Sequence, residues 1–476
     1  MYFCKAKMTW TDFILQHAQD DPVRLLLSRD KYPDIDLDLA VTTLEVRKKL
    51  RTKVPEWYAV PSLVYPFRLS GEQCSSTETS RYKAILAMRL PREGIPSETV
   101  APRPLPQDCG HPSESELSPV GPNPAGPSLL CGRGWPQVSE DMSSPGRIAD
   151  LTGGMGVDSW AFAQVAEEVL YNEVNEALVQ ATRLNFKELG IRNVRFRTER
   201  VEPGKVAEVL DGFEPDVIYL DPARRAEDGK KVFLIEECQP DVLALLPELF
   251  AASRYVLLKL SPMADITMAC KRLEHVREVH VVAASGECKE LLFLLDREWS
   301  GLPTTFVVEG GAVMEIPAGP SAGTETVGDL VISTGALSFV ISTGAKRSGE
   351  ICLFEPGKAL LKAGAFGLPC NFGLTKLGQH THLYMGAAVP EGLRPFGKTF
   401  EVLEVLPLNN RSMKEVGKRW PQAEVTARNI PMTSDLLRRK TGCVSGGDIH
   451  VFGVRAEAAS EPGNYLIITK RNERNG

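Results

Sequence analysis

The sequence predicts an α/β protein built around a doubly wound parallel sheet, with a helical region before the sheet and a small α+β module after it. Two observations predict this fold class. From Gly146 onward, short apolar runs alternate with helix-like segments, the pattern of parallel strands joined by helices. A glycine-rich turn at residues 151–156 follows the first apolar run and precedes the first helix, as in nucleotide-binding sheets.

The expected elements follow from apolar spacing and from turn residues. Strands of the sheet are expected at 147–151, 168–172, 194–197, 216–220, 255–260, 278–284 and 290–295, with helices at 157–166, 176–189 and 238–250. In the last module, strands are expected at 398–406, 423–427, 449–453 and 465–469, and helices at 412–419 and 434–440.

Composition divides the chain of 476 residues, which is long for one domain, into several segments. Pro, Ser, Gly and Glu dominate residues 91–147, and such a composition cannot bury enough apolar surface to offset the entropy of ordering. The expected segments are 1–90 (helical), 91–147 (disordered linker or insertion), 148–297 (core), 298–350 (irregular, strand-poor connection), 351–388 (short mixed segment) and 394–471 (α+β module).

The helical region at residues 1–90 allows two interpretations. Apolar residues recur there at helical spacing, as at Trp10, Phe13 and Ile14. The preferred interpretation is a helical cap that packs on the following domain. The alternative is that residues 73–83 border a substrate cleft.

The overall composition, with 43% hydrophobic and 24% charged residues, is that of a soluble globular protein. No apolar run approaches the roughly 18–20 residues needed to cross a bilayer, and the N-terminus lacks a signal-peptide core. Ten cysteines are scattered without a C-x-x-C pair, which argues against a zinc site and fits a reducing cytosol. The net charge of −6 disfavours a chain that is basic overall, but it leaves room for a local basic face.

The sequence DLTGGMG at residues 150–156 is the first candidate ligand site. Glycines let a ligand approach main-chain N–H groups, because they have no Cβ and accept positive φ. A dinucleotide fingerprint requires a third glycine where this chain has Ser159, and Asp150 before the turn would repel a pyrophosphate. The loop therefore suits a ligand with an amino group and no phosphate, and it resembles the loop of class I S-adenosylmethionine (SAM) methyltransferases. SAM is thus preferred over a dinucleotide, with a structural turn as the remaining alternative. The expected cofactor-binding residues here are Asp150, Thr152, Gly153, Gly154, Gly156 and Asp158.

Two further acids are candidates for the nucleoside part of the ligand. Glu173 closes the second strand, where an acid accepts hydrogen bonds from ribose hydroxyls of either SAM or a dinucleotide. It is alternatively a helix-start acid favoured by the helix dipole. Glu199, just past the third strand, is expected to accept from the adenine amino group.

The catalytic candidates stand at the ends of the fourth and fifth strands, where open α/β sheets place reactive groups. The Asp221 carboxylate would hold an amine or ring N–H and accept its proton, while Pro222 stiffens the turn. Arg224 or Arg225 would clamp an RNA phosphate. Lys259 would orient a hydroxyl or phosphate, or would simply pair with Asp221. The alternative for the turn is a capping Asp followed by solvated arginines.

In combination, these motifs resemble bacterial class I SAM-dependent methyltransferases with a C-terminal THUMP-like domain. The resemblance implies a Rossmann-like core that binds SAM, a ferredoxin-like segment at 351–388 and a THUMP-like domain at 394–471. THUMP domains bind RNA, so RNA is the implied substrate. The residues that carry it are 150–156, 221–225, 259–262, 287–290, 355–356, 362–365, 382–384 and 428–431. Enzymes that methylate base amines usually have Asp/Asn-Pro-Pro and an aromatic residue, whereas this chain has Ala223 and Arg224.

The C-terminal module has a local excess of basic residues. From Arg394 to Lys440 there are ten Lys or Arg and five acids, a balance of 10 − 5 = +5. Such a face provides the phosphate-directed part of RNA binding, although a charged run is often only a solvated surface. We therefore expect a cytoplasmic SAM-dependent methyltransferase acting on a base of tRNA or rRNA, without metal or membrane partner. The alternatives are a methyltransferase of a protein or small molecule, a non-catalytic RNA-binding adaptor, and a dehydrogenase.

Overall fold

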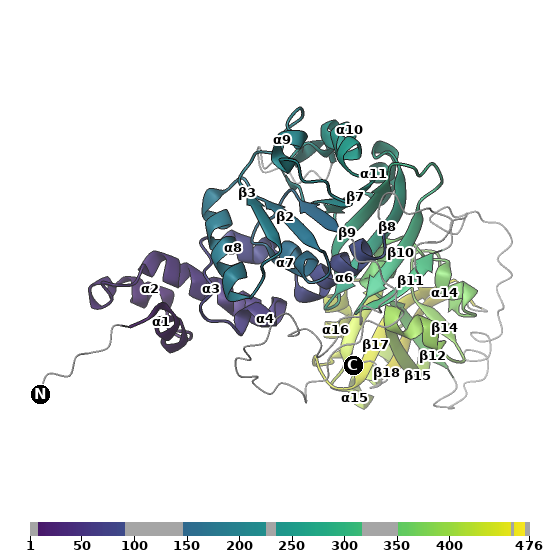
Figure 1. Cartoon of the computed structure of the whole chain (residues 1–476). Helices are drawn as coiled ribbons and strands as arrows, with labels where there is room; N and C mark the ends of the chain where they lie inside the picture. The colour runs from purple at the N-terminus through teal and green to yellow at the C-terminus, as the bar shows by residue number, and fades with distance from the viewer. Residues whose placement is uncertain (1–7, 91–145, 225–234, 317–350, 458–460, 472–476) are drawn as a thin grey trace, which may run out of the picture. The chain divides into compact units, whose positions relative to one another are not determined.

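The computed structural model describes residues 8–90, 146–224, 235–316, 351–457 and 461–471 (Figure 1). The expected linker at 91–147 falls outside these ranges except for its last two residues. Chain contacts define two compact units, one of Met1–His280 with Lys289–Pro303 and the other of Val281–Cys288 with Thr304–Gly476. Within the described ranges, no helix combines the length and apolar character that a membrane crossing requires.

The first unit begins with short helices whose starts are set by polar capping residues. Side chains of Thr9, Asp21, Asp36 and Ser76 each accept a hydrogen bond from the first turn of the helix that follows. Pro55 stands in the first turn of another helix, where its missing N–H costs no hydrogen bond. The helices are α1 (Trp10–Gln16), α2 (Pro22–Leu26), α3 (Leu37–Lys53), α4 (Pro55–Tyr58), α5 (Arg68–Gln73) and α6 (Thr77–Met88).

The sheet of the first unit has parallel strands in the order β7-β4-β1-β2-β3, with β9 antiparallel to β7. Central strands such as Val217–Leu220 are buried along their whole length, as strands covered on both faces must be. The strands are β1 (Arg147–Asp150), β2 (Glu168–Asn172), β3 (Val194–Arg197), β4 (Val217–Leu220), β7 (Tyr255–Leu260), β8 (Val276–Ala284) and β9 (Glu287–Asp296), and a separate ribbon pairs β5 (Ala223–Arg224) with β6 (Cys238–Gln239). The end of β8 and the start of β9, within Val281–Cys288, belong to the second unit.

Helices α7 (Val157–Ala163), α8 (Glu176–Glu188), α9 (Val206–Leu210), α10 (Val242–Ala252) and α11 (Ile266–Arg272) connect or follow these strands (Figure 1). The chain leaves β1 toward β2 on one side and later returns to β4 on the other. The carboxyl ends of β1 and β4 therefore form the topological switch point at which open α/β sheets bind ligands. The predicted doubly wound fold is confirmed.

Helix α6 is fixed in the first unit by polar contacts as well as by apolar packing against α7. The Tyr82 hydroxyl lies 2.8 Å from Nδ1 of the buried His280, and His280 Nε2 lies 3.0 Å from Glu278. Arg89 also pairs with Glu278. Burial and the neighbouring Arg89 hold the pKa of His280 well below its ordinary value, so the imidazole is neutral.

The second unit contains a sheet whose described strands run in the order β13-β14-β12-β15-β18-β17-β16. All of its pairs are antiparallel except β16 with β17. Its strands are β12 (Cys352–Pro356), β13 (Thr375–Lys376), β14 (Tyr384–Gly386), β15 (Gly397–Pro407), β16 (Glu424–Arg428), β17 (Ile449–Ala456) and β18 (Gly463–Arg471), and its helices are α13 (Lys358–Lys362), α14 (Leu368–Asn371), α15 (Asn410–Arg419) and α16 (Ser434–Thr441).

One sequence expectation was wrong within this unit. The connection at 298–350 was expected to be irregular, but it contains a β-hairpin of β10 (Thr304–Glu309) and β11 (Ala312–Ile316). Gly310 and Gly311 both have positive φ, which a two-residue hairpin turn requires, and β-branched residues flank them. The Gly- and Ser-rich composition of the whole stretch hid this local signal. Residues 317–350 lie outside the described ranges.

Candidate active site

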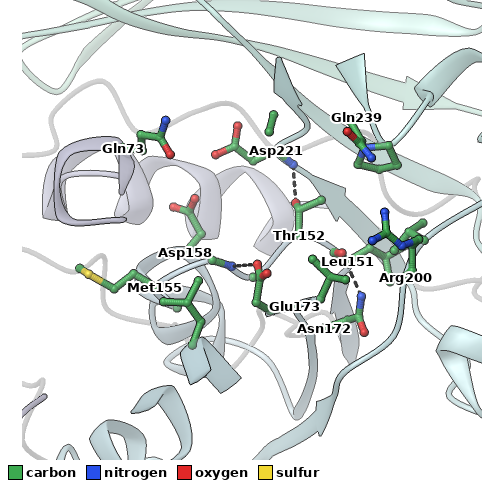
Figure 2. A pocket seen from close by; sticks show the side chains of 18 of the residues that line it. Gln73, Leu151, Thr152, Met155, Asp158, Asn172, Glu173, Arg200, Asp221 and Gln239 are labelled. Carbon is green, nitrogen blue, oxygen red and sulfur yellow. Dashed lines mark hydrogen bonds between the residues drawn. The ribbon is translucent and has the colours of Figure 1, made fainter. Parts of the chain in front are cut away.

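A pocket of about 540 Å³ lies in the first unit at the carboxyl ends of its parallel strands (Figure 2). The loops after β1, β2, β3 and β4 form most of its wall, and the end of α5 with the turn after it and residues Gln239–Asp241 form the rest. A cavity of this size holds a nucleoside-sized ligand. Among the lining residues, those used below are Gln73, Cys74, Ser75, Thr152, Gly153, Gly154, Gly156, Asp158, Asn172, Glu173, Glu199, Arg200 and Asp221.

The turn after β1 depends on glycine at two positions. A Cβ on Gly153 would stand 2.2 Å from Tyr171 Cε2, so a side chain there would displace the tyrosine ring. Gly156 has φ of +87°, and a Cβ there would stand 2.6 Å from Thr182 Cγ2. Both glycines are required by tight packing of the turn against neighbouring elements, and this packing keeps the backbone of the turn at the pocket wall.

Asp150, the acid that precedes the turn, lies beneath it and does not line the pocket. Its carboxylate accepts hydrogen bonds from Ser159 Oγ at 2.5 Å and from the Thr152 N–H at 3.1 Å. The side chain is almost completely buried, and burial raises the pKa of Asp150 to about 7. The geometry therefore assigns Asp150 to organising the loop, whereas sequence reasoning placed it at the ligand.

Asp158, on the first turn of α7, is the carboxylate that this loop presents to the pocket. Its Oδ2 accepts hydrogen bonds from Tyr219 Oη and from Ser75 Oγ, both at 2.9 Å. Its Oδ1 is buried and lies 3.1 Å from the Lys83 ammonium, with which it forms an ion pair. Asp158 thus lines the pocket on one side and pairs with Lys83 behind the wall.

Glu173 stands at the other side of the loop, where β2 ends. Its carboxylate accepts hydrogen bonds from the Gly154 N–H at 3.0 Å and from the Asn175 N–H at 2.8 Å. The first of these bonds is drawn in Figure 2. Glu173 thus couples the glycine loop to the second strand, at the place where the sequence predicts ribose recognition.

Asn172 joins three loops of the pocket and was missed by sequence reasoning. Its fully buried side chain donates to the carbonyls of Leu151, at 3.2 Å, and Glu199, at 3.0 Å, and accepts from the Glu199 N–H at 2.9 Å. The Glu199 carboxylate lines the pocket and lies 3.6 Å from Arg197. An amide at the end of an apolar strand is the signal that would have identified Asn172.

Asp221 follows β4 and is held from two directions. Its backbone N–H donates to Thr152 Oγ1 at 2.6 Å, and its carboxylate Oδ2 lies 2.5 Å from Lys259 Nζ. Burial opposes the charge of the Lys259 ammonium, but Asp221 and neighbouring carboxylates outweigh burial and raise the pKa of Lys259. Lys259 thus forms the predicted ion pair behind the pocket wall. Pro222 is buried beside Asp221, and the Arg224 side chain lies outside the described part of the structure.

The N-terminal region contributes to the wall, which favours the alternative interpretation over a simple cap. Gln73, Cys74 and Ser75 all line the pocket. Figure 2 shows the side chains of Gln73, Asp158 and Asp221 around one space. The contact of Ser75 with Asp158 joins parts of the sequence that residues 91–145 separate, so no local pattern announces it.

The charged residues that line this pocket are mostly acidic. Of the described residues that line it, six are acidic and only Arg200 is basic. The acids are Asp158, Glu173, Glu199, Glu202, Asp221 and Asp241. Within the described ranges, no group of three or more His, Cys, Asp or Glu side chains has an arrangement that would hold a metal ion. The pocket therefore favours an organic ligand with positive charge over one with phosphates.

Comparisons with known proteins agree with this geometry. Residues 353–392 match the family model of a ferredoxin-like domain, and residues 397–471 match the THUMP domain-like model. Over 99% of its length, the chain is 26% identical to a "putative methyltransferase" from Porphyromonas gingivalis W83, covering 100% of that crystal structure with a TM-score of 0.69. It is also 33% identical to an "uncharacterized RNA methyltransferase" from Lactiplantibacillus plantarum, over 81 residues that span 17% of this chain and 18% of that protein. The predicted methyltransferase-like fold and THUMP-like C-terminal domain are confirmed.

Proposed function

We propose that this protein is a SAM-dependent methyltransferase that modifies a base of structured RNA, such as tRNA or rRNA. The observation that supports SAM most directly is the acidic pocket at the switch point of the sheet. SAM carries a sulfonium and an ammonium group and has no phosphate. A dinucleotide would bring two phosphates against six carboxylates and is disfavoured by charge repulsion.

The residues of the pocket fit the parts of SAM. Glu173 would accept from the ribose hydroxyls, while Glu199 stands where the adenine amino group would be recognised. The Gly153–Gly154 backbone would lie along the ligand, and the Asp158 carboxylate would accept from the ammonium group. When bound, SAM supplies an electrophilic methyl group on its sulfonium. The protein's task is then to align a nucleophile with that methyl group.

Asp221 is the residue that we propose binds the methyl-accepting base. Its carboxylate would accept a hydrogen bond from an N–H of the target base and take the proton as the methyl group is transferred. Lys259, 2.5 Å away, pairs with Asp221 and fixes the direction of its carboxylate. Ala223 and Arg224 stand where enzymes that methylate base amines usually have a proline and an aromatic residue, so a side chain elsewhere would have to stack on the target base.

RNA is proposed as the substrate because of the second unit. Helices α15 and α16 carry seven cations and two acids in the described structure. Such a surface provides the attraction to phosphates that dominates RNA affinity. The THUMP-like match and the RNA methyltransferase relative support the same substrate. A cytoplasmic location is proposed with it, because all cysteines among the described residues are free thiols.

Methyl transfer from radiolabelled SAM tests this function. The full chain is incubated with SAM carrying a tritiated methyl group and with total RNA or total protein from a bacterial lysate. We expect label in RNA that ribonuclease releases, and much slower labelling with the Asp221→Asn variant. Label in protein alone would make this chain a protein methyltransferase. Tight SAM binding without transfer to either would favour the non-catalytic adaptor.

A further inference from the structure

Lys83 is a buried cation behind the pocket that the chemistry above does not use. It belongs to α6, its side chain is completely buried, and it lies between two carboxylates. Its ammonium is 2.9 and 3.0 Å from the oxygens of Glu290 and 3.1 Å from Asp158 Oδ1. It also donates to Ser75 Oγ at 2.8 Å. A lysine is rarely buried completely unless it is paired, and here α6 brings it to its partners.

The pairs around Lys83 form a continuous line of charges between two residues of the pocket wall. Glu290, the partner of Lys83, also lies 3.9 Å from the Lys259 ammonium. The Lys259 ammonium in turn lies 2.5 Å from the Asp221 carboxylate. The line therefore runs Asp158, Lys83, Glu290, Lys259, Asp221. Only its two ends line the pocket. Its three carboxylates and two ammonium groups leave one net negative charge.

The two carboxylates at the ends of this line, Asp158 and Asp221, are stabilised by the buried cations between them. Burial alone would favour the neutral form of each acid. Burial opposes the charge of Asp158, but Lys83 and then Lys259 outweigh it and lower the pKa of that carboxyl. Burial dominates at Glu290 and raises its pKa. Without Lys83, three carboxylates would share one ammonium group, and an acid of the line would take up a proton.

We propose that Lys83 is a positioning residue of the active site, which holds the carboxylate of Asp158, and through Glu290 and Lys259 also that of Asp221, in place facing the methyl donor. This proposal rests on the proposed SAM function. It makes α6 of the N-terminal region part of the active site. The ion pair of Asp158 with Lys83 then depends on α6, which residues 91–145 separate from the sheet in the sequence.

The alternative role for Lys83 is only to fasten α6 to the sheet through Glu290. Both roles predict that Lys83→Met destabilises the fold, because a buried carboxylate loses its partner. The double variant Lys83→Met/Glu290→Gln separates them, since it also removes the unpaired carboxylate. If Lys83 only fastens the helix, this variant recovers both stability and SAM affinity. If Lys83 positions Asp158, it recovers stability alone.

The experiment measures SAM affinity by calorimetry between pH 6 and pH 9, together with the melting temperature. For the double variant we expect a melting temperature close to that of the wild type. We also expect SAM binding to be weaker than in the wild type at pH 6 and to recover toward pH 9, because loss of Lys83 raises the pKa of the Asp158 carboxyl and each unit by which that pKa exceeds the pH is about a tenfold loss of the ionised form. The matched control is Arg81→Met, on the same helix as Lys83, which removes the 2.7 Å contact of Arg81 with Glu56 of α4. It should leave SAM affinity unchanged at every pH.

Two results would overturn the proposal in distinguishable ways. Wild-type SAM affinity and pH dependence in the double variant would leave Lys83 with a fastening role and leave the proposed function intact. No SAM binding by the wild-type chain would remove the proposed function and this inference with it. Asp150 also titrates in this pH range, because burial raises its pKa to about 7, whereas burial keeps the pKa of Tyr219 well above its ordinary value. The same pH dependence in a double variant that also carries Asp150→Asn would assign the transition to Asp158.

Discussion

The pocket of the first unit and the paired helices of the THUMP-like domain differ most in charge. Acidic lining residues outnumber basic ones by six to one in the described pocket. On α15 and α16 the described residues reverse the ratio, with seven cations and two acids. The cations are Arg411, Lys414, Lys418, Arg419, Arg438, Arg439 and Lys440. Each surface matches one of the two proposed ligands, a cationic methyl donor and a polyanionic acceptor.

This contrast shows why the net charge of −6 says little about function. The charges of the acidic pocket and of the basic helices partly cancel in the total, although each of the two surfaces attracts its own ligand. An acidic pocket also helps to exclude phosphate groups of the substrate from the donor site. The two surfaces therefore predict separable defects, in which pocket variants lose SAM chemistry and helix variants lose RNA affinity.

The largest expected effect is at the acceptor end of the pocket. Asp221→Asn removes the proposed proton acceptor but keeps size and hydrogen-bonding capacity. We expect methyl transfer to RNA to slow by about 10²–10⁴-fold, as for loss of a general base. SAM affinity should change by less than about threefold, because one lost charge among six changes the pocket field modestly. A transfer rate equal to that of the wild type would contradict the assignment of Asp221.

Asp150 tests the difference between an acid that shapes the loop and acids that face the ligand. Its pKa of about 7 in the folded protein exceeds the ordinary value of about 3.9. Its protonated form is therefore favoured by folding, and its stabilising contribution is complete below about pH 4 and lost as the pH rises through about 7. As the pH rises from 4 to 8, the unfolding free energy of Asp150→Asn should therefore increase relative to that of the wild type by roughly 2–4 kcal/mol.

Urea denaturation of both proteins across this range measures the Asp150 effect. Its control is Asp216→Asn, at an acid that accepts from the Arg147 N–H at 2.9 Å before β4. A difference between Asp150→Asn and wild type that stays constant with pH would mean that Asp150 is ionised in the fold.

Glu173 has a smaller effect that separates nucleoside recognition from charge. Glu173→Gln should weaken both SAM and its product S-adenosylhomocysteine by about tenfold, because both carry the same ribose and a hydrogen bond to a charged group is worth about 1.5–3 kcal/mol. Calorimetry with the two ligands gives the comparison. Glu168→Gln, at the far end of the same strand, is the matched control and should bind both normally. Loss of SAM alone would place Glu173 near the methyl group.

The smallest effect is expected on the basic helices. Lys414→Gln with Lys418→Gln removes two exposed cations of α15. RNA affinity should fall several-fold near physiological salt, and the slope of log affinity against log salt should decrease by about 1.4–1.8, from two lost phosphate contacts. SAM affinity should not change. Filter binding over a salt series measures this, and an unchanged slope would mean that α15 does not contact RNA.

Much of the fold follows from local patterns in the sequence. The alternation of apolar runs and helices from Gly146 onward predicted the parallel sheet, because strands buried on both faces are almost continuously apolar. The turn at Gly153 and Gly156 was predicted as a ligand loop from its composition, and it lies at the pocket. The hairpin around Gly310 was missed, since a local two-residue turn signal was averaged with a long Gly- and Ser-rich stretch.

The site was less predictable because its decisive contacts are not local. An acid before a glycine turn looks the same whether it faces the ligand, as expected for Asp150, or lies beneath the loop with Ser159. Ser75 and Lys83 reach the pocket only through tertiary packing. Their single sequence signal is a lysine inside the otherwise uncharged run from Tyr82 to Met88 on α6, a position where a buried partner is expected.

A crystal structure with S-adenosylhomocysteine tests the central claim most directly. The account predicts the ligand in the acidic pocket, with its ribose hydroxyls on Glu173 and its amino group on Asp158. Arg200 and Glu199 should border the adenine. A ligand bound elsewhere, or a pocket that stays empty and filled by its own side chains at saturating ligand, would contradict the account.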